Sequence, residues 1–157
     1  MERAKHTLNE LLVNLFNYIL HIEEKNLKEC GVPLTMNEVH TIQVIDKADD
    51  NNMTHIARVC MVSKSTLTSN ISNLERKGYV VRYKDEKDKR INRVKLTEKS
   101  YDVLKIHDDF HKNMIDKTIG DMAVEQNALL LETLENLLGY FKAEYEEKTD
   151  IIITEQD

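Results

Sequence analysis

Apolar residues recur every three or four positions over most of this chain, which is the spacing of an amphipathic helix. The pattern predicts long helices over residues 2–29, about 97–119 and about 124–147, with a shorter helix over residues 36–47. Only one proline and four glycines occur among the 157 residues, so few positions interrupt a helix. We therefore expect a mainly helical protein.

The middle of the chain, residues 53–96, has a different pattern. It predicts a short helix, a tight turn and a second helix, whose apolar face carries Leu67, Ile71 and Leu74. Ser63 suits the N-cap of that second helix, because its hydroxyl can accept a hydrogen bond from the first turn. Two helices joined in this way are typical of a helix-turn-helix.

Two strand-like runs, residues 79–83 and 91–96, follow Gly78, and a charged tip over residues 84–90 joins them. A helix-turn-helix followed by such a hairpin is the winged-helix pattern, which is typical of proteins that bind duplex DNA. The predicted fold class is therefore mainly α, a winged helix-turn-helix with a small β-hairpin wing and long terminal dimerisation helices.

We expect residues 35–96 to form the DNA-binding domain, residues 1–34 and 97–149 a helical dimerisation region, and residues 150–157 a flexible tail. The leucine-rich faces of the terminal helices carry more apolar surface than so small a DNA-binding module could cover. This surplus predicts a two-fold homodimer. The dimer would place two recognition helices roughly 34–36 Å apart on a palindromic operator in double-stranded DNA.

The residues expected to contact DNA share a polar or basic side chain on the open face of the second helix or on the hairpin tip. On the helix they are Ser63, Lys64, Ser65, Thr66, Thr68, Ser69, Asn70, Asn73, Arg76 and Lys77, and on the wing they are Lys87, Lys89 and Arg90. Small polar side chains suit base edges and phosphate oxygens, and the basic groups suit phosphates.

The distribution of charge supports this interpretation. The chain has a net charge of −6, which by itself argues against nucleic acid. Residues 54–95, however, carry eleven basic against four acidic side chains, a net charge of +7, whereas the remainder has a net charge of −13. A basic module on an acidic protein creates a local positive electrostatic potential, which attracts DNA.

Other classes of protein find little support in the sequence. No apolar run approaches the roughly 18 residues of a membrane span, and the first residues lack the apolar region of a secretory signal. Cys30 and Cys60 stand far apart, which suits a reducing cytoplasm. A Gly-rich phosphate loop, a nucleophile motif and an HExxH motif are all missing from the sequence, so we do not expect an enzyme.

The chain resembles the MarR family of dimeric winged-helix repressors over nearly its whole length. The resemblance rests on LTMNEVHTIQVI, MTHIARVCMVSKSTLTSNISNLERKGYVVR and DEKDKRINRVKLTEKS. The family's wing pattern is matched by Asp85, Asp88, Lys89 and Arg90, although arginine is usual at position 89. The resemblance implies that Lys89 and Arg90 enter or flank a minor groove while residues 63–73 read the major groove.

Within the family, the chain is most similar to the FabT-type repressors of fatty-acid synthesis genes. The similar runs are LFNYILHIEEKNL, NEVHTIQVI, CMVSKSTLTSNISNLERKGYV and HDDFHKNMIDK. This resemblance implies that acyl carrier protein bearing a long acyl chain is the corepressor. The chain would enter an apolar pocket beside the dimer helices.

A second hypothesis concerns metal. His107 and His111 are four residues apart on one helix, a spacing that can present two imidazoles to one zinc ion. Glu24 shares a stripe with inward-facing leucines and is expected to point toward His40. These four residues resemble the ligand set of the zinc-uptake repressors, another MarR branch, which implies zinc as a cofactor and control of metal-uptake genes. The alternative is that the histidines are core residues, hydrogen-bonded to a neighbouring glutamate or to backbone.

Overall fold

The computed structural model describes residues 2–120 and 127–154, and the side chains up to residue 146. The chain divides into two compact units, residues 1–112 and 113–157. The sequence predicts a division by function, into a DNA-binding domain and a dimerisation region, which differs from these two compact units. That division stays a prediction. None of the described helices is long and apolar enough to cross a membrane.

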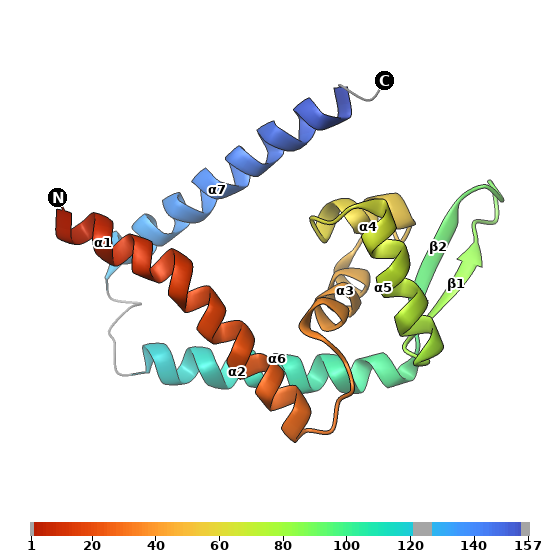
Figure 1. Ribbon diagram of the computed structural model, residues 1–157, viewed down its shortest axis with the longest axis horizontal. Coiled ribbons are helices and arrows are strands. Elements are labelled where there is room, and N and C mark those ends of the chain that lie inside the picture. Colours follow the sequence, from red (N-terminus) through yellow and green to blue (C-terminus); the bar gives the residue numbers. More distant parts are fainter. Residues whose placement is uncertain (1, 121–126, 155–157) are drawn as a thin grey trace. The chain divides into compact units, whose positions relative to one another are not determined.

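Figure 1 shows the elements of the first unit in chain order. The N-terminal helix consists of α1 (Glu2–Glu10), a π-helical stretch η1 (Leu11–Leu15) and α2 (Phe16–Glu29). It is followed by α3 (Met36–Lys47), α4 (Met53–Val59), α5 (Lys64–Arg76), β1 (Val80–Lys84), β2 (Asn92–Leu96) and α6 (Glu98–Ile119), whose last turns belong to the second unit. The predicted helix-turn-helix and wing are therefore confirmed.

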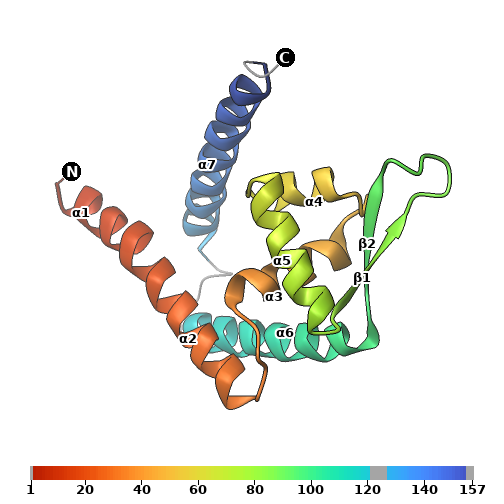
Figure 2. The same cartoon turned by 45° about the vertical axis from the view of Figure 1, so that its right-hand side comes forward.

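The core of the first unit lies where α3, α4 and α5 meet the hairpin, and Figure 2 shows these elements together. Its fully buried apolar side chains come from every one of these elements, and they are Val39, Ile42, Ile56, Leu67, Ile71, Leu74, Val80 and Val94. Because each element contributes its apolar face to one shared core, the two helices of the helix-turn-helix and the wing are held as a single module.

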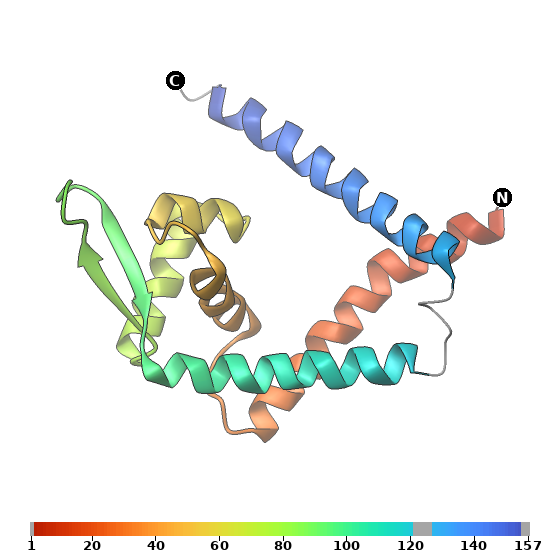
Figure 3. The ribbon, with the colours of Figure 1, turned by 180° about the vertical axis from the view of Figure 1, so that it is seen from behind.

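The strands β1 and β2 pair antiparallel, with Val80 opposite Leu96 and Lys84 opposite Asn92. Gly78 adopts a positive φ of 80° at the end of α5, which turns the chain directly into β1. After β2 the chain enters α6 within two residues, as the view from behind in Figure 3 shows. The wing is thus attached to a long helix at one end and to the recognition helix at the other.

The second unit contains α7 (Ala128–Thr154). Asn127 caps this helix, because its side chain accepts a hydrogen bond from the N–H of Leu130 at 3.1 Å. The predicted start near residue 124 lies outside the described residues. α7 continues to Thr154, past residue 150, where the predicted tail begins. The expectation of a flexible tail stays a prediction, and residues 155–157 are not described.

Candidate nucleic-acid interface

The orientation of α5 is fixed by its buried face. Leu67, Ile71 and Leu74 are all completely buried, so the opposite side of the helix must face solvent. The side chain of Ser63 accepts a hydrogen bond from the N–H of Thr66 at 3.1 Å, which confirms the predicted N-cap. Of the residues expected to contact DNA, those exposed on α5 are Lys64, Ser65, Thr66, Thr68, Ser69, Asn73 and Arg76, whereas Asn70 is half-buried.

Hydroxyl groups on this exposed face already use their protons within the helix. Thr68 donates to the carbonyl of Lys64 at 2.8 Å, and Ser69 donates to the carbonyl of Ser65 at 3.2 Å. In this arrangement their oxygens keep lone pairs free for an incoming donor. In a major groove, the exocyclic amino groups of adenine and cytosine are such donors.

Carboxylates organise the tip of the wing. Asp85 accepts hydrogen bonds from the N–H groups of Lys87 and Asp88, at 2.8 and 3.0 Å. Asp88 in turn accepts from the N–H of Arg90 and from its guanidinium, which reaches both carboxylate oxygens. This pairing lowers the pKa of Asp88 and raises that of Arg90. The side chain of Arg90 is nevertheless 91% exposed, so it is oriented but accessible.

The base of the wing is held by Arg93, whose guanidinium donates to both Asp85 and Asp50. The backbone N–H of Asp88 and then the side chain of Arg93 lower the pKa of Asp85 to about 2. A β-bridge between Asn52 and Arg93 adds a backbone link. Since Asp50 and Asn52 precede α4, these contacts join the wing to the first helix of the helix-turn-helix.

Arg82 joins β1 to the recognition helix. Its Nη2 donates to the hydroxyl of Ser72 at 2.5 Å and to the carbonyl of Thr68 at 3.2 Å. Its Nε lies 3.5 Å from the carboxylate of Glu75, which also accepts from the N–H of Arg82. These contacts fix the separation between α5 and the wing.

The structure places Lys77 differently from the other expected DNA-contacting residues. Its Nζ donates to both carboxylate oxygens of Glu38 at 2.8 Å and to the carbonyl of Pro33 at 3.0 Å. Burial alone would raise the pKa of Glu38, but the bonds from Lys77 and Thr35 lower it overall. Lys77 thus ties the end of α5 to the start of α3, whereas its neighbour Arg76 is exposed.

The histidines lie where α2, α3 and α6 meet. Glu24 is exposed, so the expectation that it points toward His40 is wrong, and its neighbour Glu23 occupies the interior, 3% exposed. The Oε1 of Glu23 is 2.5 Å from His111 Nε2 and 3.8 Å from His107 Nε2. The rings of His40 and His107 are 5.7 Å apart. Burial lowers the pKa of both His40 and His107, so both favour the neutral form.

Glu23, His107 and His111 fit the requirements of a metal site. One ligand atom from each lies within 4.8 Å of the others. Glu23 Oε1 and His111 Nε2 are close but not aligned for a hydrogen bond, and neither ring nitrogen of His107 has a hydrogen-bond partner among the described residues. Neutral imidazoles and a carboxylate are the ligand types that zinc prefers.

Comparison with known proteins agrees with this architecture. Residues 34–91 match the model of the MarR family. FabT of Streptococcus pneumoniae, solved in complex with DNA, is 36% identical, with a TM-score of 0.81 over 88% of this chain and 98% of that one. The chain belongs to the MarR family. It is a DNA-binding transcriptional regulator, and because MarR regulators are not enzymes, the expectation of no catalytic activity is confirmed.

Two further proteins are similar to this chain. The HTH-type transcriptional regulator SarZ of Staphylococcus epidermidis is 27% identical over 112 residues, which cover 71% of this chain and 73% of SarZ. The S. aureus MepR–DNA complex is 22% identical, with a TM-score of 0.64 over 80% of this chain and 95% of that one, and it supports the fold alone.

Three residues of this region were missed by sequence reasoning. Arg82 and Arg93 lie on the strands, where the alternation of apolar and charged residues predicts a hairpin but no role for a single arginine. Their hydrogen-bond partners are up to 43 residues away in sequence. Glu23 was passed over in favour of Glu24, although it is spaced four residues from buried Leu27. Glu24 is likewise spaced four residues from Leu20, so spacing alone does not separate the two glutamates.

Proposed function

We propose that this MarR protein is a homodimeric repressor of fatty-acid synthesis genes, acting in the cytoplasm with long-chain acyl-acyl carrier protein as its corepressor. The observation that carries the proposal is the 36% identity to FabT over 98% of the FabT chain. A likeness of this extent includes the helices outside the DNA-binding module, where an effector would act.

The apolar surface of the N-terminal helix supports the dimer. Leu8, Leu11, Leu12, Leu15 and Phe16 are all exposed, although they recur at helical spacing. An exposed stripe of this kind is unfavourable in water and marks a protein interface. Dimers are typical of the MarR family, and a two-fold dimer would present two copies of α5 to a palindromic operator.

In this proposal the exposed face of α5 reads the major groove and the wing reaches the adjacent minor groove. Arg90 and Lys89 supply the charge at the tip, with Lys87 beside them. Asp88 orients Arg90 before DNA arrives, which reduces the entropy that its long side chain would lose on binding. Lys77 contributes by holding α5 in place through Glu38.

The corepressor is tested by mobility shift on a fatty-acid synthesis promoter fragment. Adding acyl carrier protein that carries an 18-carbon acyl chain should lower the protein concentration needed for half-saturation. The matched control is the same carrier protein with an unacylated phosphopantetheine arm, which should leave the half-saturating protein concentration unchanged. An equal effect of both carriers, or of neither, would contradict the corepressor assignment.

A second candidate is a zinc-responsive repressor of metal-uptake genes, and the buried Glu23 and His107 with the half-buried His111 favour it. These side chains would hold the ion, with His40 adjacent to His107. When bound, zinc would link α2 to α6 and stabilise the position of the DNA-binding module.

Elemental analysis and thermal unfolding test this candidate without DNA. One zinc per protomer, and a melting temperature that falls after dialysis against a chelator, would support it. The variant His111→Ala should lose both effects, whereas His21→Ala, an exposed histidine on α2, should retain them. Metal-free protein with an unchanged melting temperature would exclude the zinc assignment and leave the histidines as core residues.

A further inference from the structure

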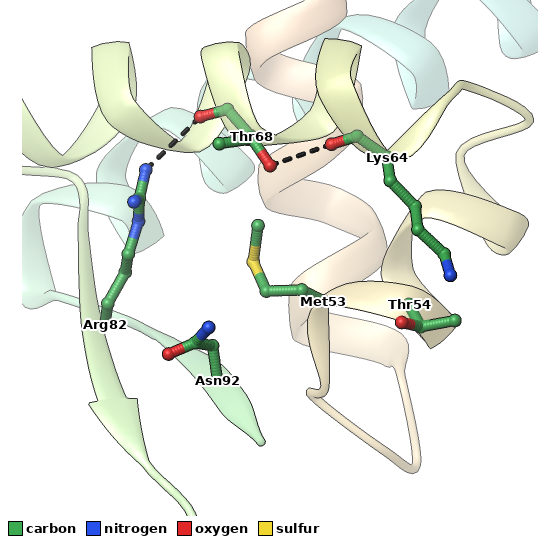
Figure 4. Close-up of a pocket in the computed structure, with 6 residues that line it drawn as sticks. All are labelled: Met53, Thr54, Lys64, Thr68, Arg82 and Asn92. Atoms are coloured by element: carbon green, nitrogen blue, oxygen red, sulfur yellow. Dashed lines mark hydrogen bonds between the residues drawn. The ribbon is translucent and has the colours of Figure 1, made fainter. Parts of the chain in front are cut away.

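A hollow of about 250 Å³ lies between the recognition helix and the base of the wing (Figure 4). Its lining residues come from α4, α5 and both strands, and they are Met53, Thr54, Lys64, Thr68, Arg82 and Asn92. Two of the six are cations, and no acidic residue lines it. Its lining therefore suits an anion.

The position of the hollow suggests which anion it binds. If α5 enters a major groove and the wing tip enters the adjacent minor groove, the strand that separates these grooves must cross the surface between α5 and the hairpin. That strand is a sugar–phosphate backbone, which carries one negative charge per nucleotide. We propose that the hollow binds a phosphodiester group of this strand. The inference rests on the proposed placement of α5 and the wing on DNA.

Three side chains of the hollow are available to an incoming phosphate. Lys64, Thr54 and Asn92 are exposed, and within the described residues no hydrogen bond or ion pair engages their polar side-chain atoms. Each carries at least one donor, which is what phosphate oxygens require. Lys64 is also the first residue of α5, where the helix dipole favours negative charge.

Arg82 and Met53 have supporting roles. In Figure 4 the guanidinium of Arg82 points toward the backbone of α5, where it donates to the carbonyl of Thr68. It is therefore a positioning residue that fixes the width of the hollow and adds positive charge beside it. Met53 presents its thioether between the two sides of the hollow, an apolar contact that suits a deoxyribose ring.

Binding measurements on two duplexes test the proposal. One duplex is a sequence selected by the protein from random DNA, and the other is a scrambled sequence of the same composition. Lys64→Met should weaken both by the same factor, on the order of tenfold, and reduce the slope of log K against log salt by about 1. Lys28→Met, an exposed lysine on α2, is the matched control and should change neither quantity.

Neutral phosphate substitutions identify the partner of the hollow. In a series of selected duplexes, each with a single methylphosphonate, several positions should weaken binding of the wild-type protein, and one of them is the phosphate held in the hollow. At that position Lys64→Met, Thr54→Val and Asn92→Ala should add no further loss, because all three act on the same phosphate. At every other position, the loss of binding free energy from the methylphosphonate and the loss from the protein variant should add.

Distinct results separate the possible failures. Full additivity at every position, or a Lys64→Met variant that changes sequence preference while keeping the wild-type salt slope, would overturn the phosphate site but leave the DNA-binding function intact. Wild-type protein that selects no sequence from random DNA would overturn the proposed placement on DNA and the phosphate site together.

Discussion

The recognition helix and the N-terminal helix both have apolar residues at helical spacing, but they bury them to different extents. On α5, Leu67, Ile71 and Leu74 are 0% exposed. On the N-terminal helix, the residues from Leu8 to Phe16 that form the apolar stripe remain 39–62% exposed. The first stripe meets α3, α4 and the hairpin of the same chain, whereas the buried core formed by the described residues does not include the second.

The difference separates two kinds of stability. The stripe on α5 stabilises the fold of the protomer, so the geometry of the DNA-binding module is set before any partner binds. The stripe on the N-terminal helix contributes its hydrophobic free energy only when something else covers it, at about 25 cal/mol per Å². Under the proposed function a second copy of the chain covers it, and stability then depends on protein concentration.

Truncating the buried stripe should have the largest effect. Leu67→Ala should lower the free energy of unfolding by about 2–5 kcal/mol, because it leaves a cavity in a fully packed core. Urea denaturation followed by circular dichroism measures this loss. Leu12→Ala on the exposed stripe should cost the isolated protomer less than about 1 kcal/mol. Equal losses at the two positions would remove the distinction between the stripes.

Placing a charge on the exposed stripe should break association instead of folding. Leu12→Asp would bury an unpaired carboxylate in a dimer interface, so sedimentation should shift from dimer to monomer and operator binding should fall with it. Asn17→Asp, an exposed residue of α2, is the control for added charge and should leave the sedimentation unchanged. A Leu12→Asp variant that still sediments as a dimer would place the interface elsewhere.

The wing should show a smaller effect that is confined to DNA. Arg90→Ala should weaken operator binding by about 1–3 kcal/mol without altering the dimer mass, since the side chain is exposed and supports no core contact. A mobility-shift titration measures the change, with Arg3→Ala on α1 as the matched control. Unchanged affinity would remove Arg90 from the interface.

The smallest expected effect is a pH dependence of stability that arises at the base of the wing. The pKa of Asp85 is lowered from 3.8 to about 2, so its ionised form stabilises the fold above the unfolded pKa. That contribution should disappear as the pH falls from about 4 through 2. In urea titrations across this range, Asp85→Asn should show a flatter decline than the wild type, and Glu86→Gln should decline like the wild type. Parallel curves for Asp85→Asn and the wild type would argue against the hydrogen bonds from Asp88, Arg93 and Lys87 that stabilise the ionised Asp85.

Several features could be read from sequence because they depend on neighbouring residues. The N-cap at Ser63, the turn at Gly78 and the buried trio of α5 follow from local spacing and local hydrogen bonds. The hairpin followed the same logic, although β1 begins one residue later than predicted. Each of these features involves residues that lie within a few positions of one another.

The misplaced and missed residues depend on contacts between distant segments. Glu23 and Glu24 both lie near the leucine stripe of α2, and the crossing of α2 with α6 decided which one is buried beside the histidines. The sequence predicts Lys77 as a DNA-contacting residue, but in the fold Lys77 pairs with Glu38, which is 39 residues away. Arg82 and Arg93 acquired their roles in the same way.

The sequence alone therefore determined the order of the elements, the winged helix-turn-helix and the faces that exclude water, because periodicity and caps are local properties of the chain. Only the tertiary structure decided which charged groups remain available to DNA and which are engaged within the protein. The physical reason is that ion pairs form between whichever oppositely charged side chains the fold brings within about 4 Å. Spacing along the chain does not encode that distance.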